Sequence, residues 1–185
     1  MRVTLQFMIG IWLSLVALDA FAEDSRNYSP YFNGSFVEVS VRGAQNFDDA
    51  NSLGFDLGFR HSFPMLLLDS RVSWRYDDFD ETRNGLHYGF GAHPLYMFLL
   101  GNSWLSYVVS SFYLELGAGV DFQSSGIGPA LTLGAGLDFP LWDADAGHSP
   151  WLNALYRHHW SFTEASIDTH MIFLGLAWRR NGLLF

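Results

Sequence analysis

Two stretches in the second half of the chain decide the fold: Phe112–Phe122, with the sequence FYLELGAGVDF, and Ala130–Phe139, with the sequence ALTLGAGLDF. In both, apolar residues alternate with residues that are mostly small, polar or charged. Successive side chains of a β-strand point to opposite faces, so the alternation gives each strand one apolar face and one polar face. Such a strand is suited to lipid on one side and a narrow polar lumen on the other.

The same alternation extends outward along the chain. It is clear in Leu53–Arg60 and Leu66–Asp77, and weaker in Tyr31–Gly43, Leu86–Phe98, Trp151–Phe162 and Thr169–Arg179. Most of these eight segments have about ten residues or more, the length that a tilted strand needs to cross the hydrocarbon layer. Bacterial outer-membrane barrels have an even number of antiparallel strands. The sequence therefore predicts an all-β fold, an eight-stranded antiparallel transmembrane β-barrel.

The first residues predict export. Arg2 precedes an apolar run from Phe7 to Leu18, and Ala20-Phe21-Ala22 has the small-x-small form of a signal-peptidase site. The run is shorter than the roughly 20 residues of a spanning helix, which argues against the alternative of a retained anchor. We expect a signal peptide over residues 1–22, cleaved after Ala22, and a barrel domain over residues 23–185 in the outer membrane of a Gram-negative bacterium.

The polar segments between the strands predict the orientation of the barrel. Gln45–Asn51 and Asp77–Gly85 are rich in acidic residues, and we expect both to be loops at the outer end. Both termini then lie at the periplasmic end.

The composition supports a membrane surface. Hydrophobic residues make up 49% of the chain and aromatic residues 17%, more than an ordinary solvated surface needs. Tyrosine and tryptophan favour the interface between lipid headgroups and acyl chains. We expect two aromatic girdles formed by the residues near strand ends: Trp74, Tyr76, Tyr88, Tyr96, Trp104, Tyr107, Trp142, Trp151, Tyr156, Trp160 and Trp178.

Charge and cysteine content exclude several classes of function. The net charge of −9 argues against nucleic acid as a partner, and the absence of cysteine excludes disulfides and thiolate metal sites. His158 and His159 are adjacent in a strand and point to opposite faces, so they cannot both enter one metal site. We expect no metal and no cofactor. The expected partners of a monomeric barrel are outer-membrane lipids, lipopolysaccharide and the barrel assembly machinery.

The polar face of the strands carries six acidic residues and five arginines. Unpaired charges in a narrow tube of low dielectric constant are very costly, so we expect a network of salt bridges. All ten basic residues are arginines, whose planar guanidinium can bind two carboxylates at once. The network would plug the lumen, and the alternative is a narrow passive channel. The residues are Glu38, Arg42, Asp56, Arg60, Asp69, Arg71, Arg75, Glu115, Asp121, Asp138 and Arg157.

Four motifs resemble the opacity-type, outer-membrane-protein-A-like family of small barrels. They are Gly117–Phe122 (GAGVDF), Gly134–Phe139 (GAGLDF), Tyr156–Trp160 (YRHHW), and Asp168-Thr169-His170 with Gly175–Trp178 (GLAW). The resemblance covers most of the chain after the signal peptide and is strongest after residue 110. It implies eight antiparallel strands and roles that range from envelope anchoring to adhesion, so it leaves the activity open.

A second, weaker resemblance is to the lipid A 3-O-deacylase family. His159-Trp160-Ser161 resembles its histidine and serine, which implies a serine nucleophile, a histidine base and an orienting acid, here Asp168 or Glu164. Phe162 stands where that family has asparagine, and the spacing to the acid is short. That family's site opens toward lipid, whereas His159 shares the parity of Asn153 and Arg157. We therefore expect a structural or surface-interaction barrel without catalysis, with deacylase as the alternative.

Overall fold

The computed structural model describes residues 36–47, 53–63, 68–78, 82–95, 104–141, 148–163 and 168–181. These residues form eight strands and one short helix. The strands are β1 (Phe36–Asn46), β2 (Leu53–Ser62), β3 (Leu68–Asp78), β4 (Thr82–Ala92), β5 (Tyr113–Gln123), β6 (Gly126–Pro140), β7 (His148–Ser161) and β8 (Asp168–Asn181), and the helix α2 (Trp104–Ser110) lies between β4 and β5.

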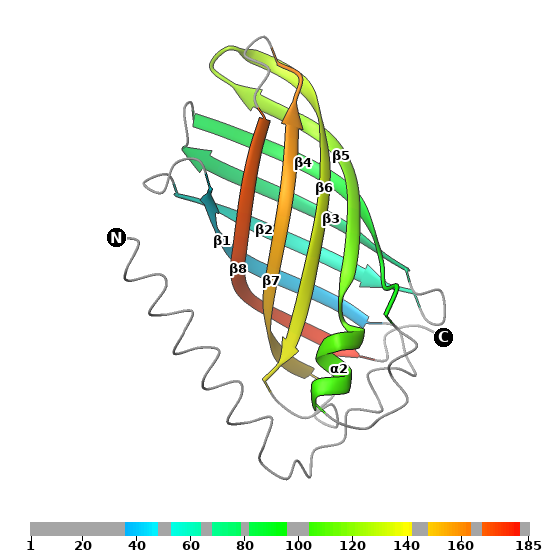
Figure 1. Cartoon of the computed structure of the whole chain (residues 1–185). Coiled ribbons are helices and arrows are strands. Elements are labelled where there is room, and N and C mark those ends of the chain that lie inside the picture. The colour runs from blue at the N-terminus through cyan, green and yellow to red at the C-terminus, as the bar shows by residue number, and fades with distance from the viewer. Residues whose placement is uncertain are drawn as a thin grey trace.

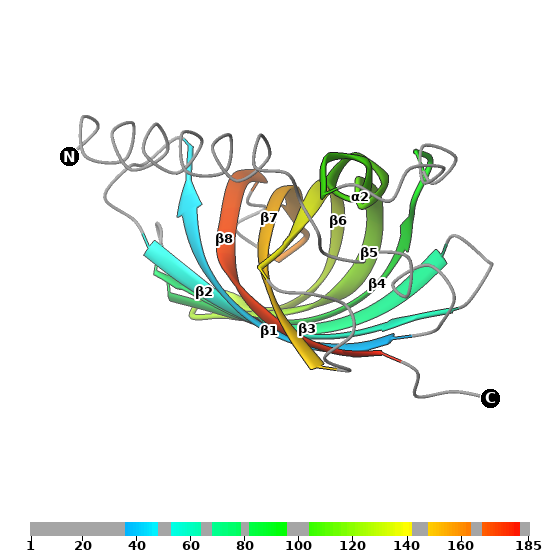
Figure 2. The same cartoon turned by 90° about the horizontal axis from the view of Figure 1, so that it is seen from below.

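The strands close into a barrel in chain order. Each strand pairs antiparallel with its neighbour, and β1 also pairs with β8, where Val41 lies opposite Leu176. Closure leaves no unpaired strand edge. Figure 1 shows α2 at one end of the barrel and the long β5–β6 hairpin at the other, and Figure 2 shows the strands curving around a common interior. The prediction of an eight-stranded antiparallel β-barrel is confirmed. We call the two ends the helix end and the hairpin end.

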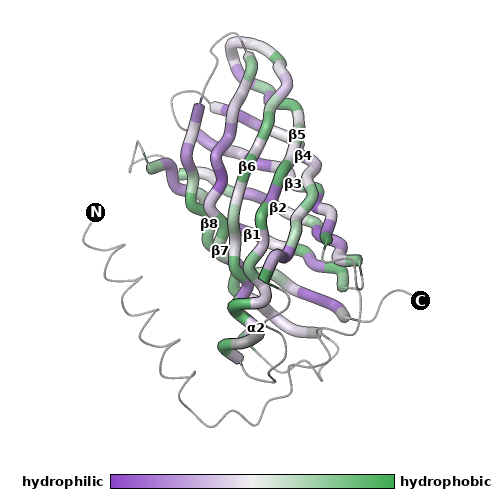
Figure 3. The backbone as a smooth tube through the Cα atoms, turned by 45° about the vertical axis from the view of Figure 1, so that its right-hand side comes forward, coloured by the Kyte–Doolittle hydropathy of each residue, from purple (hydrophilic) through white to green (hydrophobic). Residues whose placement is uncertain are grey.

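The alternation seen in the sequence separates the two faces of the wall. Leu116 and Leu133 are 65% and 49% exposed on the outside, while their neighbours Glu115 and Thr132 are buried inside. Figure 3 shows the resulting change between hydrophobic and hydrophilic residues along the tube. Within the part of the chain that the structure describes, no helix is long and apolar enough to cross a membrane.

The region around β4 differs from the sequence prediction. Asp77–Gly85 was predicted to be a loop and Leu86–Phe98 a strand, but β4 begins at Thr82 and ends at Ala92. Pairing between β3 and β4 continues to Asp77 opposite Arg83 and Asp78 opposite Thr82. The polar composition of this segment suggested a loop, but the residues of a barrel strand that face the lumen can also be polar, so polarity alone does not exclude a strand. The hairpin is therefore longer, and its connection shorter, than predicted.

The helix end also differs from the prediction. Trp104, Tyr107 and Trp151 were expected in an aromatic girdle, but they are buried together with Val108 and Ala177. Trp104 and Tyr107 belong to α2, which was not predicted, and they contact the inward-facing Trp151 of β7. A seven-residue helix is too short to leave a clear period in the sequence. Its apolar side covers an apolar patch inside the barrel.

Several predictions fall on residues outside those that the structure describes: the signal peptide over residues 1–22 with its cleavage after Ala22, the girdle residues Tyr96 and Trp142, and Glu164.

Candidate functional site

The interior of the barrel is the candidate functional site because it concentrates charge. Among the described residues, seven carboxylates and seven guanidinium groups are buried there, each with 4% exposure or less. Their charges cancel, although the whole chain has a net charge of −9. All eleven charged side chains assigned to the lumen from the sequence are in this set, joined by Asp77, Arg83 and Arg179.

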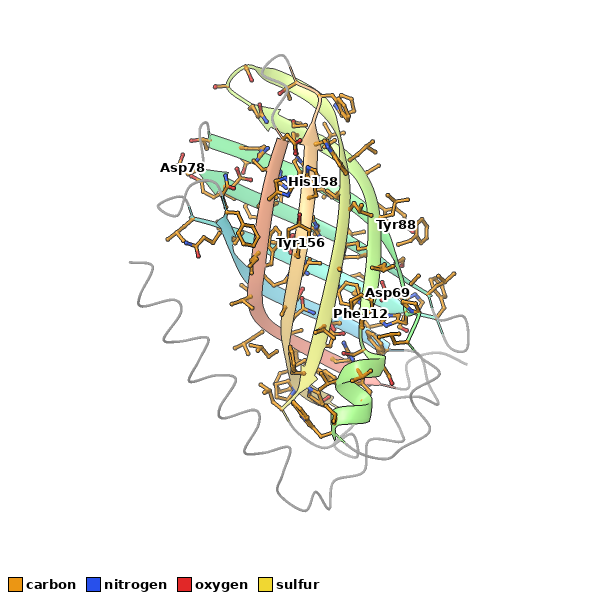
Figure 4. All side chains as sticks on the ribbon, in the orientation of Figure 1. Asp69, Asp78, Tyr88, Phe112, Tyr156 and His158 are labelled. Atoms are coloured by element: carbon orange, nitrogen blue, oxygen red, sulfur yellow. The ribbon has the colours of Figure 1, made fainter. Side chains whose placement is uncertain are left out.

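Arg60 and Arg179 organise the charges at the helix end. Both bind the same carboxylate oxygen of Asp138, with nitrogen–oxygen distances of 2.7 Å and 2.8 Å. Arg60 also binds Asp69 at 2.5 Å, and Arg179 binds Glu38 at 2.6 Å. These residues come from β1, β2, β3, β6 and β8, so the cluster joins strands across the interior; Figure 4 labels Asp69 near the start of β3.

The helix α2 is bonded to this cluster. Arg179 Nη1 donates a hydrogen bond to the hydroxyl of Tyr107 over 3.1 Å. Just after α2, Ser111 Oγ donates to the main-chain oxygen of Asp138 at 2.8 Å and accepts from its main-chain nitrogen at 3.0 Å. The guanidinium of Arg179 also lies over the ring of Trp151, 3.9 Å from the ring centre. Helix and charge cluster therefore fill the same end of the barrel.

A second cluster fills the middle of the barrel. Glu115 binds Arg71 at 2.6 Å through one carboxylate oxygen and Arg157 at 2.5 Å through the other. Arg157 also lies 3.4 Å from Asp56, which forms a further ion pair with Arg42. This series of alternating charges begins at Arg42 on β1 and ends at Arg71 on β3, with Arg157 of β7 between them. Breaking a buried pair by removing one partner typically costs about 3–5 kcal/mol, so these contacts hold the strands in one arrangement.

The third cluster lies toward the hairpin end and contains two histidines. Asp121 accepts at 2.7 Å from His159 and at 3.1 Å from His87, both contacts through Nε2. Arg75 Nη2 lies 3.1 Å from His159 Nε2 and 3.5 Å from Asp121. Arg75 also forms an ion pair with Asp77 at 2.9 Å, and Asp77 one with Arg83 at 3.0 Å. His87, Asp121 and His159 are close enough to share an ion, but the guanidinium already supplies a positive charge there.

The three candidate catalytic residues are not brought together. His159 and Ser161 face the interior with 0% and 2% exposure. Ser161 Oγ accepts a hydrogen bond from Gln123 over 3.3 Å. His159 Nε2 is bonded to Asp121, and Arg75 Nη2 lies 3.1 Å from the same nitrogen. Asp168 is on the outer surface, where its side chain is 58% exposed and pairs with His158. The barrel wall thus separates the carboxylate of Asp168 from the imidazole of His159.

Sequence reasoning missed three charges of the network for different reasons. Arg83 fell in the segment predicted as a loop, and Arg179 at the very end of a predicted strand. Asp77 stood at the boundary between the predicted strand Leu66–Asp77 and the predicted loop Asp77–Gly85, and it was not counted with the lumen charges. The signal for Arg83 was present, since it shares its parity with Gly85, His87, Gly89 and Gly91 of β4, all of which are on the same side of the strand.

Comparisons with known proteins return structures only. No family model matches the chain, and no curated protein sequence matches it. The N-terminal β-barrel domain of Pseudomonas aeruginosa OprF is 13% identical, with 80% of this chain and 99% of that chain covered and a TM-score of 0.48. Neisserial surface protein A is 12% identical, with coverages of 80% and 96% and a TM-score of 0.43.

A further similar structure is Ail, the attachment invasion locus protein of Yersinia pestis, in complex with the heparin analogue sucrose octasulfate. It is 13% identical, with 80% of this chain and 99% of that chain covered and a TM-score of 0.32. The barrel described above rests on its own strand pairing and not on these similarities.

Proposed function

We propose that the protein is an integral outer-membrane β-barrel of a Gram-negative bacterium with a structural or surface-interaction role and a plugged lumen. The observation that carries the proposal is the polarity of the wall. Large apolar side chains are exposed on every strand, whereas fourteen charged side chains are buried inside. A soluble barrel has the opposite arrangement, and soluble monomers rarely expose apolar patches larger than a few hundred Å².

The distribution of exposed apolar residues supports a lipid contact on all sides. Strands β1 to β8 each contribute at least one large apolar residue to the outside, including Val41, Leu57, Val72 and Phe90 on the first four strands. Leu116, Leu131, Tyr156 and Leu176 continue the surface over the other four. A protein–protein interface would need such a surface on one side only. A continuous belt is what a bilayer requires.

The filled interior supports the plug over the passive channel. The three charge clusters occupy the helix end, the middle and the hairpin side of the lumen, and the carboxylates and guanidinium groups bind one another. A conducting pore needs charged groups that face water. The proposal also includes a monomeric state, because a closed barrel has no edge to which another strand could pair. It further includes assembly by the barrel assembly machinery and contact with outer-membrane lipids and lipopolysaccharide.

The location is tested by fractionating cells that express the full chain. We expect the protein in the outer-membrane fraction, starting at Glu23, and migrating differently on gels before and after boiling because a closed barrel resists detergent. A soluble periplasmic protein with residues 1–22 intact would contradict the proposal. So would identical migration of boiled and unboiled samples.

A further inference from the structure

The outer surface near the hairpin end carries a polar cluster that the lumen network does not use. His158 of β7 and His170 of β8 lie directly opposite each other in the strand register. Their rings are stacked, with centres 4.0 Å apart, and His158 Nε2 is hydrogen-bonded to Asp168. One ligand atom of each of the three residues lies within 4.8 Å of the others. Figure 4 shows His158 beyond Tyr156 along β7.

The position of the cluster is unusual because the surrounding wall is apolar. The strand partner of His158 on its other side is Leu133, and that of Trp160 is Leu131, both exposed. Two imidazoles and a carboxylate at this position are not part of the salt-bridge network inside. Their joint presence on two adjacent strands needs a separate physical reason.

The outer cluster differs from the histidine cluster in the lumen because no guanidinium group of the described residues is bonded to it. Inside, Arg75 lies against His159 and Asp121. Among the described residues, every arginine except Arg180 is buried in the lumen, and Arg180 belongs to the helix-end part of β8, opposite Val37 of β1. No arginine of the described segments therefore forms an ion pair with Asp168, so a metal ion can supply the positive charge there.

The donor set points to the kind of ion. Imidazole nitrogen suits zinc, copper, iron and nickel, whereas calcium and magnesium prefer oxygen ligands. Two histidines with one carboxylate form a three-ligand set that leaves a fourth zinc position open. The Tyr156 hydroxyl lies 2.7 Å from His170 Nδ1, which leaves Nε2 of that ring for an ion. A hydrogen bond at the second nitrogen typically orients a ligating histidine.

We propose that His158, Asp168 and His170 bind a divalent transition-metal ion, with Zn²⁺ the first candidate, on the outer face of the β7–β8 hairpin. Binding requires the two stacked imidazole rings to turn out of their parallel arrangement, so that the three ligand atoms point at one ion from about 2.0–2.2 Å. Tyr156 acts as a positioning residue for His170. The fourth position holds water or an anionic group. The site depends on the pairing of β7 with β8 and is independent of the role proposed for the lumen.

The test uses the full mature chain, folded in detergent and free of any histidine tag. Titration with Zn²⁺ by calorimetry should show one saturable site, and Co²⁺ should give visible absorption bands typical of nitrogen and oxygen ligands. The variants His158→Ala and His170→Ala should each weaken binding by at least about tenfold, and Tyr156→Phe by less. His61→Ala is the matched control, because His61 lies at the helix end of β2, and it should bind as the parent does.

Folding of each variant is checked by its heat-dependent gel migration. The three ligands lie on the outer surface, so we expect the variants to fold, and Asp168→Asn provides a nearly isosteric third test. Mg²⁺ and Ca²⁺ should not compete with Zn²⁺. Absence of saturable Zn²⁺ binding in the parent protein would overturn the proposal. Undiminished binding in a folded His158→Ala/His170→Ala double variant would overturn it as well, by locating the ion elsewhere.

Discussion

The substitution Glu115→Gln tests whether the lumen network holds the barrel together. Glu115 is buried and binds Arg71 at 2.6 Å and Arg157 at 2.5 Å. Arg157 retains Asp56 at 3.4 Å, but no other carboxylate forms an ion pair with Arg71 among the described residues. Glutamine keeps the size and removes the charge, so one buried guanidinium is left without a counter-charge.

The expected loss of unfolding free energy is about 3–5 kcal/mol, the cost of breaking a buried ion pair from one side. Since 1.4 kcal/mol is a factor of ten, the folding equilibrium constant should fall by roughly a hundredfold to several thousandfold. Reversible urea unfolding from phospholipid vesicles, followed by tryptophan fluorescence, measures this change. The unfolded fraction is checked independently by gel migration.

A double-mutant cycle separates the ion pair from general damage to packing. Arg71→Met combined with Glu115→Gln removes both charges, and replacing a whole buried pair by side chains of similar volume is often close to neutral. The double variant should therefore be more stable than Glu115→Gln alone. If the single variant costs less than about 1 kcal/mol, or the double variant regains nothing, the network does not hold the strands by charge.

Three further experiments test the outer surface, the lumen and the candidate catalytic residues. Leu116→Arg should destabilise the protein by roughly 2–4 kcal/mol in vesicles if Leu116 lies near the bilayer centre. Leu116→Phe is the control and should change the stability little. Equal stability of the two variants would place this face away from lipid. In planar bilayers the protein should give no stable ohmic conductance, and steady current that disappears in Arg71→Ala would favour the channel. Mass spectrometry of lipid A should show the same acyl chains with and without Ser161→Ala or His159→Ala, and loss of one hydroxyacyl chain dependent on both residues would favour the deacylase.

The sequence by itself determined the eight-stranded barrel and the facing of most side chains. The alternation of residues in β5 and β6 has a period of two, a local property that needs no knowledge of distant partners. The same rule placed His158 and His159 on opposite faces, and in the structure His158 is half-buried on the outer side of the wall while His159 is buried inside. It also placed both Glu115 and Asp121 on the inward face.

Only the tertiary structure decided which inward residues meet. Arg179 and Asp138 are 41 positions apart and Arg157 and Asp56 are 101 apart, so their pairing depends on barrel closure and on the register of every strand between them. Closure also brought Trp151 against α2. Trp151 faces the lumen although it is apolar, and alternation alone could not show that a helix covers it there. The pairing of His158 with His170 likewise comes from the β7–β8 register. Alternation fixes the face of a residue, but its neighbours on that face are set by hydrogen bonding between strands distant in the chain.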